Sequence, residues 1–185
     1  MRRFSPSLTV LELHSLIMLF ALSTMAMADA AITAWDTKRT FVFWRPITAI
    51  QEGDNDFNPM TVGDPNWLPF LPTPPYPEYT SGANNLSGST TRMLHHFFGT
   101  DHVTFSLTSN TPQAIQKTRT YHRFSDAADD VVNVRIYQGL HFRTGDEIGR
   151  KQGSQVADWA FKHYLQPLHH GHQNNDDQGE DDDKD

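Results

Sequence analysis

The feature that most limits the fold is a proline-rich stretch between residues 52 and 80. It contains seven prolines together with several Gly, Asn and Asp residues. A proline ring fixes φ and removes an N–H donor, so this density is incompatible with a helix or a central strand. The stretch therefore predicts a long irregular loop, and loops of this length in a compact domain usually carry function.

The segments on either side of this loop favour helices. Ala, Met and Leu dominate residues 16–38, which predicts a first helix that is buried. Further helices are predicted over 84–98, ending at Gly99, over 125–138 with Ser125 as N-cap, and over 144–164. Residues 103–107 form at most a short strand. The pattern predicts an all-α fold, a helical bundle with long irregular loops. The side chains expected to be buried are Leu86, Met93, Leu94 and Phe97 in the second helix and Ile148, Val156, Trp159, Ala160 and Tyr164 in the fourth.

A chain of 185 residues can bury one core, so we expect one domain over residues 16–168, preceded by a lead over 1–15. Residues 169–185 form a His-rich and acidic tail, which we expect to be disordered because it holds too little apolar surface to fold. The last ten residues carry seven acids, and the net charge is −7. This balance argues against nucleic acid as a partner.

The N-terminus allows two interpretations. Met1-Arg2-Arg3, an apolar run and a small-residue site in residues 26–28 resemble a secretory signal, which would export the protein. The apolar residues continue to Trp35, however, which favours a buried helix and a cytoplasmic protein. The run is too short to cross a bilayer, so no transmembrane span is expected.

The absence of cysteine excludes disulfides, a thiolate zinc site and a cysteine nucleophile. Histidines 163, 169, 170 and 172 could form a metal site, but a flexible tail has no fixed ligand geometry, and solvated disorder is the favoured interpretation. Chemistry must therefore depend on other side chains.

Three segments carry residues suited to a tetrahedral oxyanion. In the first, Lys38 and Arg45 lie seven residues apart, about two helical turns, which would place both cations on one side of a helix. Two cations at this spacing usually lie on a solvent-exposed helix face. Aromatic residues between them, Phe41, Phe43 and Trp44, predict instead that this stretch is buried.

The second segment is Ser81-Gly82 before a helix, which offers a hydroxyl, an approachable amide and the positive end of the helix dipole. Taken alone, it is more often a helix cap. The third joins Arg135 to His141, where Gly139 can end the helix and turn the imidazole inward. The alternative for this pair is a surface arginine and a structural histidine.

Together the three segments resemble the signature of the vanadium-dependent haloperoxidases and the related type 2 phosphatidic acid phosphatases. That signature is Lys, six residues, Arg-Pro; then Pro-Ser-Gly-His; then Ser-Arg, five residues, His. Lys38 and Arg45-Pro46 match the first part, and Ser81-Gly82 match the middle of the second. Arg135 and His141 match the third at the same spacing.

The resemblance implies an all-helical bundle that binds vanadate, or phosphate in a phosphatase. Lys38, Arg45 and Arg135 would neutralise the equatorial oxygens, and Ser81 and the Gly82 amide would hydrogen-bond them. His141 would be the axial ligand to vanadium and the catalytic residue. The substrates implied are hydrogen peroxide and a halide. In the phosphatase alternative, His141 would attack a phosphate ester and form a phosphohistidine.

The departures from the signature define a third alternative. Ala83 stands where the family has its acid-base histidine, Thr80 replaces the proline, and Val134 replaces the serine before Arg135. Without that histidine, the chain could be a catalytically impaired binder of phosphate or vanadate. Family members are also longer, so either a second protomer of a homodimer supplies the missing half or the chain is a shortened copy.

Overall fold

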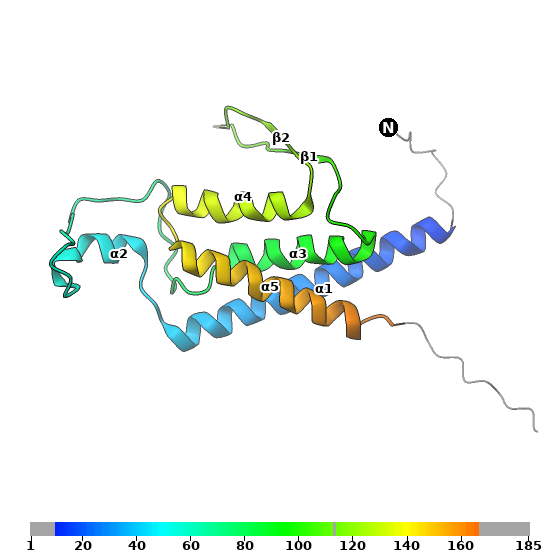
Figure 1. Cartoon of the computed structure of the whole chain (residues 1–185), viewed down its shortest axis with the longest axis horizontal. Coiled ribbons are helices and arrows are strands. Elements are labelled where there is room, and N and C mark those ends of the chain that lie inside the picture. The colour runs from blue at the N-terminus through cyan, green and yellow to red at the C-terminus, as the bar shows by residue number, and fades with distance from the viewer. Residues whose placement is uncertain (1–9, 113, 167–185) are drawn as a thin grey trace, which may run out of the picture.

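Four long helices lie side by side in the computed structural model, which describes residues 10–112 and 114–166 (Figure 1). A short helix, a 3-10 turn and a two-stranded hairpin complete the described part of the chain. The helical bundle with long loops expected from the sequence is confirmed. The elements in chain order are α1 (Val10–Phe41), α2 (Pro46–Gln51), η1 (Gly53–Asn55), α3 (Gly82–Phe98), β1 (Phe105–Thr108), β2 (Thr118–Tyr121), α4 (Phe124–Tyr137) and α5 (Arg143–His163).

The hairpin pairs β1 with β2 in antiparallel register, with Phe105 opposite Tyr121. The first strand lies close to the one expected from the sequence, and the second was not expected. Its side chains are mostly exposed, so no alternation of buried and polar residues marks it in the sequence. Hydroxyl pairs across the ladder, such as Ser106 to Thr120 at 2.9 Å, help to hold it together.

α3 is the central helix, because it contacts α1, α4 and α5. Its interface with α5 is the most extensive in the bundle and is built from glycines. A Cβ on Gly88 would collide with the backbone of Arg150, and one on Gly153 would collide with the carbonyl of Asn85. The two backbones therefore touch directly, which only glycine permits.

The buried faces of α3 and α5 differ from those predicted because of this close contact. α5 buries small residues, whereas Ile148 and Trp159, expected in the core, are 39% and 52% exposed. In α3, Met93 is buried, but Leu86, Leu94 and Phe97 are only half-buried. The faces differ because two backbones in contact leave no room for large side chains between them. The buried residues of the two helices are instead mostly small or polar and include Asn84, Asn85, Gly88 and Ser89 of α3, and Gly149, Gly153, Ala157 and Ala160 of α5.

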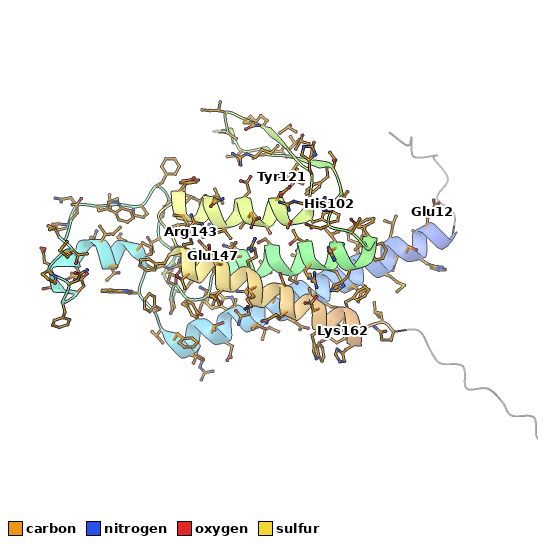
Figure 2. All side chains as sticks on the ribbon, viewed as in Figure 1. Glu12, His102, Tyr121, Arg143, Glu147 and Lys162 are labelled. Atoms are coloured by element: carbon orange, nitrogen blue, oxygen red, sulfur yellow. The ribbon has the colours of Figure 1, made fainter. Side chains whose placement is uncertain are left out.

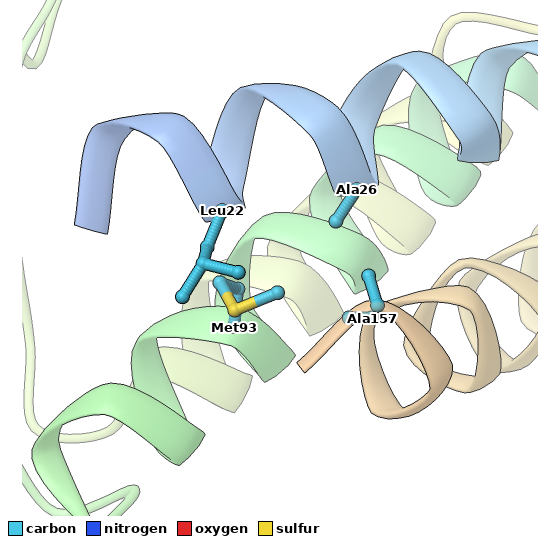
Figure 3. Packing of buried hydrophobic residues seen from close by; sticks show 5 residues of the cluster. Leu22, Ala26, Met93 and Ala157 are labelled. Carbon is cyan, nitrogen blue, oxygen red and sulfur yellow. The ribbon is translucent and has the colours of Figure 1, made fainter. Parts of the chain in front are cut away.

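The apolar core is small and lies where α1 crosses α3 and α5. Figure 3 shows Leu22 and Ala26 of α1 above Met93 of α3 and Ala157 of α5. Burial along α1 recurs every four residues, at Leu22, Ala26, Ala30, Ala34 and Lys38. The prediction of a buried first helix thus holds for one face only, and the opposite face exposes apolar side chains, among them Ile17, Phe20 and Ile32.

α1 has 32 residues, longer than the apolar run on which the expectation of no transmembrane span was based. The stretch Glu12–Gln51 has a mean hydropathy of 1.8 in its most apolar window and is long enough to cross a membrane. It meets the criteria of length and composition alone, which core helices and signal sequences also meet. Both the apolar run and the small-residue site considered above for a signal lie inside this one continuous helix.

α4 begins one residue earlier than predicted, and Ser125 is not its N-cap. The N-cap position is held by Arg123, without a side-chain capping bond. Ser125 instead donates both its N–H (3.0 Å) and its hydroxyl (2.5 Å) to the carboxylate of Asp101. The carboxylate of Asp101, which lies before the hairpin in the chain, therefore accepts hydrogen bonds from the first turn of α4. A capping pattern read from neighbouring residues could not predict this contact.

We expect Gly153→Ala to destabilise the fold. The new methyl group would force α3 and α5 apart, and overpacking typically costs about 1–3 kcal/mol, more than the gain of about 1 kcal/mol from replacing a helical glycine by alanine. Urea denaturation should show a net loss of free energy of unfolding. Gly82→Ala is the matched control, because a Cβ there meets no heavy atom within 4 Å. Equal stability of the two variants would contradict the close contact.

Candidate functional site

The residues singled out in the sequence meet at one end of the bundle. α1 and α4 end there, and α3 and α5 begin there (Figure 1). Arg45 stands just beyond α1, at the N-cap position of α2. Four helix ends thus converge on residues that lie up to about 100 positions apart in the chain.

Lys38 and Arg45 are held by the backbone at the end of the proline-rich loop. The ammonium group of Lys38 donates to the carbonyls of Pro77 (2.9 Å) and Glu78 (2.8 Å). Arg45 donates from Nε to the carbonyl of Tyr76 (3.1 Å) and from Nη2 to that of Pro77 (3.4 Å). The ring of Tyr76 lies 5.4 Å from Lys38 Nζ and 5.0 Å from Arg45 Cζ. Three consecutive loop residues therefore orient both cations.

Two expectations for this segment are corrected. The two cations do not share a helix face, because α1 ends at Phe41, before Arg45 is reached. The intervening aromatic residues are also not buried, since Phe41 is 60% and Phe43 47% exposed. Lys38 and Arg45 are nonetheless only 2% and 5% exposed, because the loop covers them. Burial and the charge of Arg45 lower the pKa of Lys38 to about 8.

His141 is buried and hydrogen-bonded through both ring nitrogens. Nδ1 lies 2.7 Å from Oε1 of Glu78, and Nη1 of Arg45 lies 3.1 Å from Nε2. A guanidinium group can only donate, so Nε2 accepts and the ring proton resides on Nδ1, directed at the Glu78 carboxylate. Burial lowers the pKa of His141 despite this carboxylate, which favours the neutral imidazole. As expected, Gly139, with a φ of 72°, follows the end of α4 and turns the chain toward this position.

Ser81 and Gly82 lie at the start of α3. Ser81 occupies the N-cap position, but its side chain makes no capping bond, so the simple cap interpretation fails. Its N–H donates to the carbonyl of Gly145 (3.1 Å), and its hydroxyl accepts from Asn84 Nδ2 (3.2 Å). The space beside Gly82 is open, since a Cβ there would meet no heavy atom within 4 Å. A group outside the helix can therefore approach this amide.

Asp146 links Ser81 to His141. Its Oδ1 accepts from Asn84 (2.7 Å) and lies 4.0 Å from His141 Nδ1, and Ser81 also hydrogen-bonds the carboxylate. Oδ2 is buried without a partner among the described residues. Burial raises the pKa of Asp146 to about 6, against the opposing effect of the bonds from Ser81 and Asn84.

Arg135 is half-buried near the other cations. Its Nη1 donates to Gln138 (3.0 Å), while its Nε is buried and, among the residues that the structure describes, unpartnered. Its charge contributes to the lowered pKa values of Lys38 and Arg45, which places all three cations within electrostatic range of one another. Three cations therefore face two acids, Glu78 and Asp146.

This set of groups suits an oxyanion. The cations outnumber the acids, one guanidinium N–H lacks a partner, and there is room beside the first amide of α3, where the helix dipole is positive. A neutral imidazole completes the set with a nitrogen that carries a lone pair. These are the donors that bound vanadate or phosphate requires.

Glu78 and the carbonyls of residues 76 and 77 belong to the site although no sequence motif includes them. Glu78 lies three residues before Ser81, inside the loop that was expected to be functional, and Asp146 lies five residues after His141. Proximity to the motifs was the only sequence signal for Glu78, whereas Asp146 is next to Gly145, the position at which many members of the resembled family have Asp. Every residue has a backbone carbonyl, so the sequence could not predict which carbonyls would bind Lys38 and Arg45.

We expect the stability of an Asp146→Asn variant relative to the parent to rise between pH 4 and pH 7. Because the folded pKa lies above the unfolded one, the native state binds more protons over this range and the parent loses stability as pH increases. The shift from 3.8 to about 6 corresponds to a change in relative stability of about 2–3 kcal/mol. Urea denaturation at several pH values measures it, and a constant difference between the variants would contradict the buried, ionisable carboxyl.

Comparison with known proteins identifies the family of the chain. The chain is 33% identical over 92 residues to the vanadium chloroperoxidase of Curvularia inaequalis, which is 43% of this chain and 14% of that protein. A bacterial vanadium-dependent iodoperoxidase structure superposes with a TM-score of 0.68 at 33% identity, covering 80% of this chain and 33% of that one. A bacterial vanadium-dependent chloroperoxidase, in apo and holo forms, gives a TM-score of 0.64 at 22% identity, which supports the fold.

The chain thus spans about a third of the length of the solved relatives. The family described as the VCPO second helical-bundle domain matches residues 18–170, which include every site residue discussed above. On this match and the shared helical architecture, the chain belongs to the vanadium haloperoxidase superfamily, as a second helical-bundle domain of the vanadium chloroperoxidase type.

Proposed function

We propose that the chain binds vanadate at this end of the bundle and supports a haloperoxidase reaction. The observation that carries the proposal is the cluster of buried cations around a neutral histidine, with more positive than negative groups. Burial of like charges is unfavourable unless an anion compensates them. Among the described residues, the two acids of the cluster, Glu78 and Asp146, leave one of its three cations uncompensated, and a bound anion would supply the missing negative charge.

In this proposal, Lys38, Arg45 and Arg135 hold the vanadate oxygens by charge and hydrogen bonds. The Gly82 amide adds a neutral donor at the start of α3, and the Ser81 hydroxyl would add a second by turning its proton from Asp146 to the anion. The carbonyls of residues 76–78 keep the two buried cations oriented, so that little rearrangement is needed on binding.

His141 is the residue that would hold the vanadium of bound vanadate, through Nε2. Glu78 accepts the Nδ1 proton and so fixes the tautomer in which Nε2 carries the lone pair, the arrangement that second-shell carboxylates give to ligating histidines. Arg45 donates to that lone pair in the structure. An oxyanion that takes over the N–H groups of Arg45 would leave Nε2 available.

Bound vanadate supplies the means to activate hydrogen peroxide for oxidation of a halide. In this proposal, the residues of this chain bind and orient the anion. The group for proton transfer is the one that the motif lacks. Ala83 carries no ionisable group at the position where the resemblance places an acid-base histidine. Asp146 is a buried carboxyl of the site, and its pKa of about 6 lets it hold a proton in part of the molecules near neutral pH.

The alternatives proposed from the sequence act at the same residues. In a phosphatase, Nε2 of His141 would attack a phosphate ester, and in an impaired homologue the site would bind vanadate or phosphate without turnover. The relatives found by comparison are peroxidases, which favours the first proposal over these two. A homodimer that completes the site also stays a prediction.

We expect vanadate and phosphate to compete for one site, because both are tetrahedral oxyanions that the same cations bind. Arg135→Ala should weaken both at least tenfold, since a hydrogen bond to a charged group typically contributes about 1.5–3 kcal/mol. Isothermal titration calorimetry with each anion, and with vanadate in the presence of phosphate, measures these affinities.

Arg143→Ala is the matched control. Arg143 lies at the start of α5 on the outer surface, beside Glu147 at 3.8 Å (Figure 2). The Arg143→Ala substitution removes the same charge from the same end of the bundle without altering the site. The dissociation constants of both anions should therefore change by no more than about twofold, because surface charges are screened. Normal affinity in Arg135→Ala would remove Arg135 from the site.

We also expect Ala83→His to raise vanadate-dependent peroxidase turnover at least tenfold, with anion affinity little changed. A positioned acid-base group typically contributes about 10²–10⁴-fold to the rate, and the cations that bind the anion would be unaltered. Halide oxidation with and without added vanadate measures this. A parent chain that turns over at ordinary enzymatic rates, and slows on this substitution, would show that another residue supplies the proton.

A further inference from the structure

A cavity of about 600 Å³ adjoins Glu78 and Gly145 and is not used by the proposed anion site. Five of its nine lining residues are aromatic, and the lining comes from the end of α1, the following linker, α2, the end of the proline-rich loop and the start of α5. The aromatic side chains that line it are Phe41, Phe43, Trp44, Tyr79 and Phe142.

We infer that this cavity binds a small, uncharged aromatic molecule that carries an O–H or N–H donor, such as a phenol or an indole. The inference concerns a second site, and it does not depend on vanadate binding. Three properties of the cavity support it: its size, the arrangement of its rings and the single carboxylate in its wall.

The size and the rings fit a flat apolar ligand. Pockets for small molecules typically enclose about 300–1,000 Å³ and are lined by apolar and aromatic side chains with a few polar groups. Here, Phe41 meets Tyr79 edge-to-face at 5.3 Å, and Phe43 meets Phe142 edge-to-face at 5.9 Å. Rings that already interact in this way can admit another ring in an offset or edge-to-face position.

The carboxylate of Glu78 provides the polar anchor. The hydrogen bonds to it from His141 Nδ1 and the Phe142 N–H both end on Oε1. No hydrogen bond from within residues 10–112 and 114–166 reaches Oε2. Gly145 lines the cavity beside Glu78, and a Cβ there would collide with both carboxylate oxygens, so only a glycine lets the carboxylate lie at this wall. A ligand O–H or N–H is the group that this acceptor can still bind.

The surrounding charges decide the class of ligand. Lys38 donates to the backbone carbonyl of Glu78, and Arg45 donates to the imidazole that Glu78 holds, so both cations lie near this carboxylate and oppose the entry of a cation. The apolar walls disfavour an anion, because they offer it no compensating donor. A neutral ring with one donor satisfies both conditions.

The test is the binding of phenol to the full chain without vanadate, followed by chemical-shift changes in NMR spectra. We expect a dissociation constant of about 1 mM, as is typical of a ligand with so few heavy atoms. Anisole, in which a methyl group replaces the phenolic hydrogen, should bind at least tenfold more weakly. Equal binding of the two would overturn the role of Glu78.

Ala49→Phe should abolish phenol binding, because Ala49 lines the cavity and a larger side chain would fill it. Thr48→Phe is the matched control, since Thr48 lies on the same helix, α2, and is exposed. Inorganic phosphate should bind equally to both variants, which confirms that the anion site is intact. Unchanged phenol binding in Ala49→Phe would overturn the proposal. Concentration-dependent dimerisation that Ala49→Phe removes, seen by analytical ultracentrifugation, would also overturn it by making a second copy the occupant.

Discussion

The direct contact between the backbones of α3 and α5 is the constraint on which the rest of the structure depends. Glycines 88, 149 and 153 face backbone atoms of the opposite helix, at distances that a side chain would not allow. This contact aligns the N-termini of the two helices, and the Ser81 N–H bonds the carbonyl of Gly145 between them. The positive ends of two helix dipoles therefore meet beside the cations, where an anion would gain most from them.

The sequence predicts the class and the order of the helices because their hydrophobic and helix-forming residues are locally grouped. It does not predict which faces are buried, since a glycine-mediated interface replaces the apolar stripe that periodicity detects. The same holds for the site. Lys38, Arg45, Ser81 and His141 come from recognisable motifs and do lie together, whereas Glu78 is recognisable only from its contact with His141, which spans 63 positions in the chain.

The electrostatics of the site show how a small domain can keep like charges buried. Backbone carbonyls accept some of the hydrogen bonds of Lys38 and Arg45 in place of water, but they supply no full negative charge. Glu78 and Asp146 supply charge but are shared with His141 and Asn84. The cations are thus held in place while part of their charge stays uncompensated, and this separation of positioning from neutralisation is what an anion-binding protein requires.

The proline content of the loop affects how firmly the site residues are held. Its last residues hold Lys38 and Arg45, yet the loop has almost no hydrophobic core of its own, and Phe57, Met60 and Phe70 are exposed. Proline restricts the unfolded chain as much as the folded one, so ordering such a segment loses less conformational entropy than ordering an ordinary loop. The loop that holds the site is therefore kept ordered largely because the unfolded chain has little conformational entropy to lose. This contribution comes from the denatured state, so the contacts of the native protein do not show it.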